Sequence, residues 1–118
     1  MQQTLKRIDK LLKPIEYQYV FDSAYKSSDK YFLVLGRKNN IDHSRLGLAI
    51  SKKSLRLAVS RNYIKRLVRD KFRTDPDIRK NNIDFVVLAR KNIIQYSNRQ
   101  LLFSLEKNFH QIIRHLNK

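Results

Sequence analysis

The chain has 118 residues, with 26 Lys and Arg against 10 Asp and Glu, and a formal net charge of +16 at pH 7. This length suits a single domain with one hydrophobic core, and so large a positive charge indicates a polyanionic partner that offsets its self-repulsion. The absence of cysteine excludes disulfides and thiolate metal sites. No apolar run approaches the ~18 residues of a membrane span and no signal peptide is evident, so we expect a cytoplasmic protein.

The first half of the chain predicts a basic arm, one helix and two strands. We expect residues 1–13 to form a flexible basic arm. Pro14 can open a helix over residues 15–26, because its fixed φ suits the first helical turn. Residues 31–37 and 45–51 are short runs rich in apolar residues, separated by the turn residues "NNIDHS". We expect these two strands to pair as a hairpin.

The second half predicts a basic helix, a strand and a C-terminal helix. Helical periodicity extends over residues 57–73, and residues 83–90 form a nearly continuous apolar strand. Ser97 and Gln100 have the spacing of a capping box at the start of the last helix. The order αββαβα predicts an α+β sandwich, a small mixed sheet with helices packed on it. The second strand, basic helix and third strand form a βαβ unit, whose strands should be parallel.

The basic helix has one apolar face and one cationic face at about 100° per residue. The apolar face consists of Ile64, Leu67, Val68 and Phe72, and the cationic stripe consists of Asn62, Lys65, Arg66, Arg69 and Arg73. A charged outer face is ordinary on a surface helix, but such faces usually mix signs, because like charges at i, i+4 destabilise a helix by a few tenths of a kcal/mol. No acid offsets the pairs Lys65–Arg69 and Arg69–Arg73. This pattern favours a bound anion.

The same bias extends over a longer segment, in which Asp70 is the single acid. Its basic residues are Arg45, Lys52, Lys53, Arg56, Arg61, Lys65, Arg66, Arg69, Lys71 and Arg73. Arg donates two parallel hydrogen bonds to a phosphate and Lys supplies a compact charge, so the segment predicts nucleic-acid contact. Charge alone does not distinguish RNA from DNA.

Aromatic residues form a second candidate surface. Tyr17, Tyr19, Phe21, Tyr25, Tyr31 and Phe32 occur in the first predicted helix and strand. They could stack on unpaired bases, as in other sheet-based RNA-binding proteins, or they could pack in the core. We assign Phe103 and Phe109 of the last helix to the core.

The segment "RLGLAISKKSLRLAVSRNYIKRLVRDKFR", residues 45–73, resembles the signature of the bacterial ribonuclease P protein subunit. That signature runs R-(hydrophobic)-G, then S-K-K, a short turn, and R-N-x-x-K-R-x-x-R. "EYQYVF" resembles the first-helix motif of the family, in which Phe usually follows the acid, and "IDFVVLAR" resembles its third strand. The chain departs from the family at residues 54–56, where many members carry Gly in the turn.

The resemblance implies a subunit of a ribonucleoprotein endoribonuclease that removes the 5′ leader of precursor tRNA. The RNA subunit would perform the hydrolysis with bound Mg²⁺. The implied fold is that of ribosomal protein S5 domain 2, with a left-handed βαβ crossover. The residues implied to contact the RNA subunit are Lys52, Lys53, Arg61, Asn62, Lys65, Arg66 and Arg69. Tyr17 and Phe21 would line a cleft for the leader, and charge adds Arg45, Arg56 and Arg73 to the RNA-binding set.

The chain offers no catalytic or metal-binding motif of its own. The ten acids are scattered, and His43, His110 and His115 lack the spacing of paired metal ligands. The predicted partners are therefore ribonuclease P RNA and precursor tRNA, with no small-molecule substrate. Two alternatives remain: a ribosomal or other structural RNA-binding protein of the same fold, and a membrane-surface protein. The membrane alternative would expose the apolar helix face that the core needs.

Overall fold

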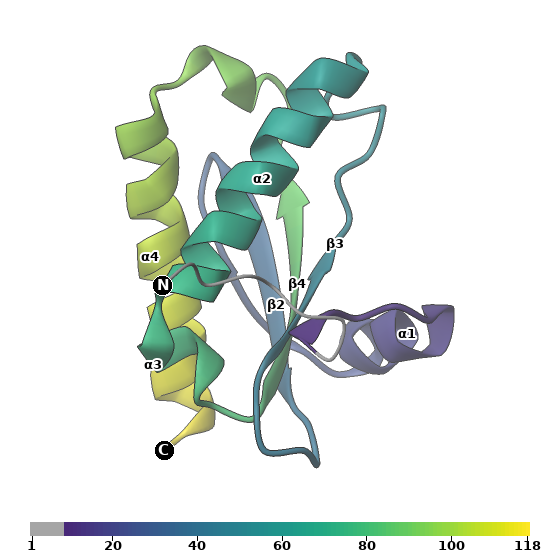
Figure 1. The fold of residues 1–118 in the computed structure, drawn as a ribbon, viewed down its shortest axis with the longest axis vertical. Coiled ribbons are helices and arrows are strands. Elements are labelled where there is room, and N and C mark those ends of the chain that lie inside the picture. Colours follow the sequence, from purple (N-terminus) through teal and green to yellow (C-terminus); the bar gives the residue numbers. More distant parts are fainter. Residues whose placement is uncertain (1–8) are drawn as a thin grey trace.

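The computed structural model describes residues 9–118 and has the predicted α+β class (Figure 1). In chain order its elements are α1 (Pro14–Asp22), β1 (Tyr25–Ser28), β2 (Phe32–Lys38), β3 (Arg45–Leu48), α2 (Ala58–Thr74), α3 (Pro76–Arg79), β4 (Ile83–Ala89), the 3₁₀ helix η2 (Ile93–Gln95) and α4 (Asn98–Leu116). The sequence predicted the large helices and three of the strands, but it missed β1 and α3. No helix among the described residues is both long enough and apolar enough to cross a bilayer.

The four strands form one mixed sheet in the order β1-β2-β4-β3. The predicted hairpin between β2 and β3 is therefore wrong, because β4 lies between them, antiparallel to β2 and parallel to β3. All residues of β4 except Leu88 are buried, which requires a neighbour on each edge and cover on each face. The actual hairpin joins β2 to β1. Residues 25–28 form that strand, although we expected the first helix to continue through residue 26.

The βαβ unit has the left-handed crossover that the family resemblance implies. In the upper half of Figure 1, α2 passes in front of the sheet, β3 lies to the right of β4, and both strands run upward. Crossovers between parallel strands are right-handed in almost all proteins. The strand order leaves β3 as an edge strand, and the handedness sets the face of the sheet on which α2 lies (Figure 1).

The larger hydrophobic core lies between the sheet and the helices α2 and α4. Phe85 of β4 is at its centre, with ring centroids 6.5 Å from Phe72 of α2 and 5.0 Å from Phe109 of α4. The assignment of Phe109 to the core is thus confirmed. The assignment of Phe103 is wrong, because its side chain is 71% exposed. Phe103 is two positions from both Leu101 and Leu105, which are buried, so it points about 200° away from each of them.

A smaller cluster covers part of the opposite face of the sheet. It contains Leu11 from the N-terminal segment, Val20 from α1, and Leu35 and Val86 from the sheet. The N–H of Leu11 donates to the carbonyl of Leu46 in β3 at 3.0 Å. Lys10 and Leu11 therefore lie along β3, and the flexibility expected for residues 1–13 stays a prediction. Residues 1–8 of the predicted arm lie outside the described residues.

A buried polar network ties the β1–β2 turn to α4. Asp29 accepts hydrogen bonds from Ser104 Oγ at 2.6 Å, from Asn108 Nδ2 at 3.1 Å and from the backbone N–H groups of residues 31–32. Ser27 Oγ of β1 donates to Asn108 Oδ1 at 2.7 Å. Burial by itself raises the pKa of Asp29. The hydrogen bonds from Ser104, the backbone and Asn108 outweigh this effect, so the pKa lies below its ordinary value.

We expect the substitution Asp29→Asn to lower the free energy of unfolding at neutral pH by about 1–3 kcal/mol, because the amide leaves some of these donors without an acceptor. A depressed carboxyl pKa stabilises the fold above the unfolded-state value of about 3.9, and this stabilisation disappears as the pH falls through the folded-state pKa. The difference between the wild type and Asp29→Asn should therefore shrink in acid. Urea unfolding at neutral pH and at about pH 3 measures it, with the exposed Asp22→Asn as the control. Equal losses in both variants would contradict this role.

Candidate nucleic-acid interface

Some of the basic residues of α2 are neutralised within the protein. Lys71 Nζ lies 3.3 Å from Asp75 Oδ2 and also contacts Glu106 of α4. Arg73 forms an ion pair with Asp70 at 3.0 Å. Arg61 donates to the carbonyls of residues 55–56, both at 2.9 Å, and so supports the chain entering the helix. These three cations have partners within the protein, and the predicted RNA contacts of Arg61 and Arg73 stay predictions.

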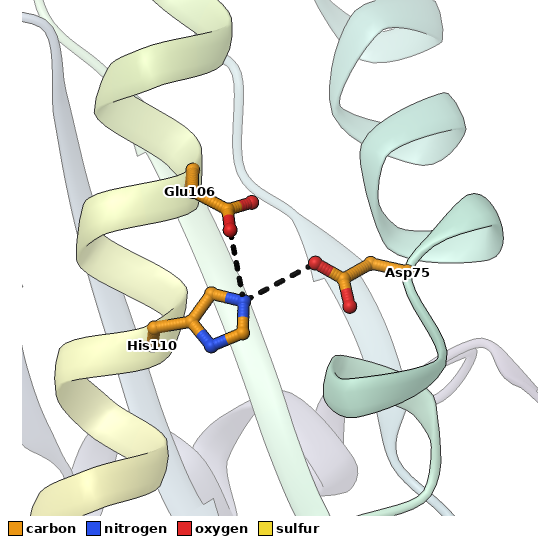
Figure 2. Close-up of side chains that lie close together, drawn as sticks. All are labelled: Asp75, Glu106 and His110. Atoms are coloured by element: carbon orange, nitrogen blue, oxygen red, sulfur yellow. Dashed lines mark hydrogen bonds and ion pairs between the residues drawn. The ribbon is translucent and has the colours of Figure 1, made fainter.

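The acids around Lys71 also hold His110 (Figure 2). His110 Nε2 lies 3.2 Å from Asp75 Oδ2 and 3.3 Å from Glu106 Oε1. Asp75, Glu106 and His110 have the ligand types and the proximity of a metal site. However, the Lys71 ammonium contacts the carboxylates of both Asp75 and Glu106. Burial raises the pKa of Asp75, and the hydrogen bonds from His110 and Lys71 outweigh this and lower it. The cluster is a set of ion pairs that joins the end of α2 to α4, and we call it the clasp.

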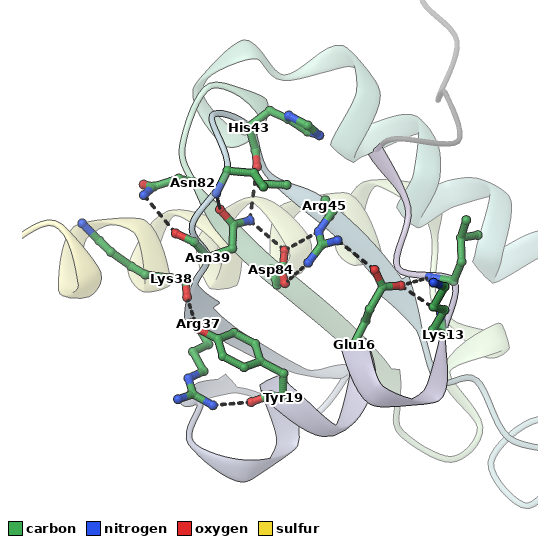
Figure 3. A network of polar contacts seen from close by, with 12 residues as sticks. Lys13, Glu16, Tyr19, Arg37, Lys38, Asn39, His43, Arg45, Asn82 and Asp84 are labelled. Atoms are coloured by element: carbon green, nitrogen blue, oxygen red, sulfur yellow. Dashed lines mark hydrogen bonds and ion pairs between the residues drawn. The ribbon is translucent and has the colours of Figure 1, made fainter.

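Arg45 is also committed inside the protein (Figure 3). Its Nε and Nη2 donate to the fully buried Asp84 at 2.9 and 2.6 Å, and its Nη1 donates to Glu16 at 2.9 Å. The hydrogen bond with Asp84 raises the pKa of Arg45 above its ordinary value. Asn39 Nδ2 donates to the same carboxylate at 2.7 Å. Arg45 therefore has a structural role in neutralising a buried acid, and its predicted contact with RNA stays a prediction.

The remaining predicted residues, all exposed except the half-buried Lys65, form a surface that we call the cationic face. It consists of Lys52, Lys53, Arg56, Asn62, Lys65, Arg66 and Arg69. Among the described residues, no carboxylate pairs with any of its six cations. Lys65 and Arg69 are one turn apart on α2 and still repel each other. Their charge is available to an external anion.

The turn that carries the paired lysines forms without glycine. Ser51 Oγ accepts from the N–H of Ser54 at 3.2 Å, and the Ser51 carbonyl accepts from the N–H of Leu55 at 3.0 Å. Leu55 is buried beneath the turn. Among the described residues only Asn92 has a positive φ, so residues 54–56 require no left-handed conformation. The departure from the family pattern in this turn leaves Lys52 and Lys53 exposed.

Tyr17 lies against the edge of β3, close to the cationic face. Its hydroxyl accepts a hydrogen bond from the N–H of Leu48 at 3.2 Å. Its ring covers Gly47, where an added Cβ would lie 2.7 Å from Tyr17 Cε1. Tyr17, Lys65 and Arg69 line one groove, and Lys65 also lines a neighbouring hollow of about 400 Å³ over the end of β3 and β4. The structure thus brings the predicted aromatic and cationic sites together at Tyr17.

The other aromatic candidates are dispersed. Phe21 is 44% exposed on α1, whereas Phe32 is fully buried in the core. The Tyr19 ring lies 3.8 Å from the Arg37 guanidinium. Tyr25 stacks on His115 with ring centroids 3.7 Å apart. Tyr31 packs edge-to-face on Tyr96 with centroids 4.8 Å apart, with Lys30 above both rings. Sequence reasoning did not single out Tyr96 or Lys30, because their contact is long-range in the chain.

Comparison with known proteins decides between the candidate families. The model of the family described as ribonuclease P matches residues 5–113. The chain belongs to this family. It is 45% identical to the ribonuclease P protein component of Methylococcus capsulatus over 87% of this chain and 80% of the relative. The corresponding protein of Vibrio vulnificus is 41% identical over 89% of this chain and 88% of the relative.

Solved structures of the family have the same fold. The ribonuclease P protein of Staphylococcus aureus aligns with a TM-score of 0.79 and 30% identity, covering 87% of this chain and 94% of that one. The Thermotoga maritima protein aligns with a TM-score of 0.74 and 29% identity, covering 83% and 92%. The chain is therefore a protein component of the ribonuclease P endoribonuclease, and this family membership implies a ribonuclease P RNA partner. The ribosomal and membrane-surface alternatives are set aside.

We expect Arg66→Ala and Arg69→Ala each to weaken RNA binding and to reduce the slope of log affinity against log salt by about one unit, because each removes one phosphate contact. Both side chains are exposed, so the melting temperature should change little. Filter binding across a salt series, together with thermal unfolding, measures both effects.

Lys71→Ala is the matched control, because it removes the same charge from the same helix within the clasp. It should lower the melting temperature and leave the salt slope unchanged. If the slope of log affinity against log salt fell equally in Lys71→Ala and Arg66→Ala, Lys71 would contact RNA as Arg66 does. That result would contradict the separation of the α2 cations paired within the protein from those of the cationic face.

Proposed function

We propose that the cationic face binds ribonuclease P RNA and that the partly open face of the sheet beside α1 receives the 5′ leader of precursor tRNA. The carrying observation is that six cations lie on one surface without acidic partners among the described residues. Phosphates are the anions that best match a linear series of Lys and Arg. The half-buried Ala49, Leu33 and Leu88 beside α1 leave apolar surface on which bases could lie.

We further propose that the RNA performs the hydrolysis with Mg²⁺ held mainly by RNA and substrate. All ten carboxylates of the chain lie within the described residues. Nine of them contact a Lys, Arg or His side chain, and Asp22 accepts a hydrogen bond from Gln18 at 2.6 Å. No two of these carboxylates remain unpaired to hold a pair of hydrolytic metal ions.

Because the proposed substrate is precursor tRNA, we also propose that the protein acts in the cytoplasm.

Reconstitution tests this division of labour. The chain mixed with a bacterial ribonuclease P RNA should restore cleavage of precursor tRNA at a Mg²⁺ concentration where the RNA alone is slow, because its cations reduce repulsion between RNA and substrate. Gel analysis of 5′-labelled precursor measures the rate. The nuclease-treated protein should produce no mature 5′ end. Correct cleavage by that RNA-free protein would overturn the proposal.

Phe21→Ala tests the leader site separately. We expect this change to weaken holoenzyme binding of precursor tRNA by about 5- to 150-fold, the loss of one base–aromatic stack of about 1–3 kcal/mol. Binding of mature tRNA, which lacks the leader, should not change. Tyr19→Ala is the control on the same helix, because the Tyr19 ring packs on Arg37 and its hydroxyl donates to the Lys38 carbonyl. Equal effects on precursor and mature tRNA would exclude leader stacking at Phe21.

A further inference from the structure

One groove on this chain combines cations from two distant segments. It lies where the N-terminal segment, α1, β3 and α2 meet, and has a volume of about 220 Å³. Its lining consists of Lys10, Leu11, Leu12, Tyr17, Leu46, Leu48, Lys65 and Arg69. Three cations and a phenol therefore surround one small space whose lining includes no acid. Lys10 lies outside the segment that carries the family signature and was not among the predicted site residues.

The exposed edge of β3 positions these groups. Lys10 forms a parallel β-bridge with Leu46, which places it at a set register along the strand. The next outward N–H, that of Leu48, donates to the Tyr17 hydroxyl. An edge strand leaves such groups unpaired unless something covers them. The N-terminal segment covers one position and a tyrosine side chain covers the next, so Lys10 and Tyr17 are adjacent because both complete the same edge.

Tyr17 adds a hydrogen-bond donor to the groove. Because its oxygen already accepts from the Leu48 N–H, the hydroxyl proton remains to be donated elsewhere. The absence of a side chain at Gly47 lets the ring approach β3 closely, because a Cβ there would lie 2.7 Å from Tyr17 Cε1. The proton is therefore presented beside the groove that Lys65 and Arg69 line.

We propose that this groove is a phosphate-binding site, in which Lys10, Lys65, Arg69 and the Tyr17 hydroxyl all donate to one phosphodiester group of bound RNA. This inference deepens the proposed function and rests on it. None of the three cations has a carboxylate partner among the described residues, and Lys65 and Arg69 repel each other across one helical turn. A phosphate offers acceptor oxygens to several donors at once and removes that repulsion.

Lys10→Gln compared with Lys13→Gln tests the site. Both changes remove one charge from the same short segment, but Lys13 does not line the groove. We expect Lys10→Gln to reduce the slope of log affinity against log salt by about one unit, and Lys13→Gln to reduce it much less. Thermal unfolding of both variants in the absence of RNA checks that the fold is retained. Tyr17→Phe should weaken binding without changing the slope, because it removes no charge.

The phosphate could belong to the leader or to the ribonuclease P RNA, and two measurements separate these sources. If the leader supplies the phosphate, replacing that one leader phosphate by a neutral methylphosphonate should abolish the effect of Lys10→Gln on binding. If Lys10→Gln instead reduces the slope of log affinity against log salt for binding of ribonuclease P RNA alone, the RNA subunit supplies the phosphate. Equal slopes for Lys10→Gln and Lys13→Gln with both RNAs would overturn the site. If Arg66→Ala still flattened the slope in that case, the proposed function would stand without it.

Discussion

Three side chains fix the rotation of α2, and the surface chemistry follows from that rotation. Ile64, Val68 and Phe72 are fully buried against the sheet and α4. Each is followed at once by a cation, Lys65, Arg69 or Arg73, which the helix places about 100° away. Burying one large apolar side chain contributes about 1.5–3 kcal/mol, whereas a like-charge pair costs a few tenths. The packing therefore prevails, and the repelling cations stay at the flank of the helix next to β3.

The parts of the fold that local pattern could predict were those with long, uniform periodicity. The amphipathic α2 and α4 and the continuous apolar β4 were visible in this way. β1 was missed because "YKSS" is short and follows residues with helical spacing. The pairing of β2 with β3 was wrong because it assumed that consecutive strands are neighbours, and the burial of β4 on both faces depends on a crossover that local sequence does not specify. The left-handed crossover was available only through family resemblance.

The candidate site shows a different limit of sequence reasoning. Residue type and spacing identified the cationic segment, but they could not say which cations were already neutralised. Arg45 meets Asp84 and Glu16, which are 39 and 29 residues away in the chain. Lys71 meets Glu106 on another helix. Such partners come together only in the fold, so a charge count along the sequence overstates the external surface. In the structure, the cations of the cationic face have no carboxylate partner among the described residues.

The edge of β3 then explains why the aromatic and cationic surfaces meet. α2 packs on one face of the sheet and α1 on the other, so their side chains can approach one another only around an edge. β3 is that edge in the strand order β1-β2-β4-β3, and its hydrogen-bonding groups on the side away from β4 have no neighbouring strand of the sheet. Tyr17 and the N-terminal segment reach round from the α1 side to cover them. Lys65 and Arg69 reach the same groove from α2. A chain of RNA passing from the cationic face toward α1 would cross this edge, where donors from both sides of the sheet converge.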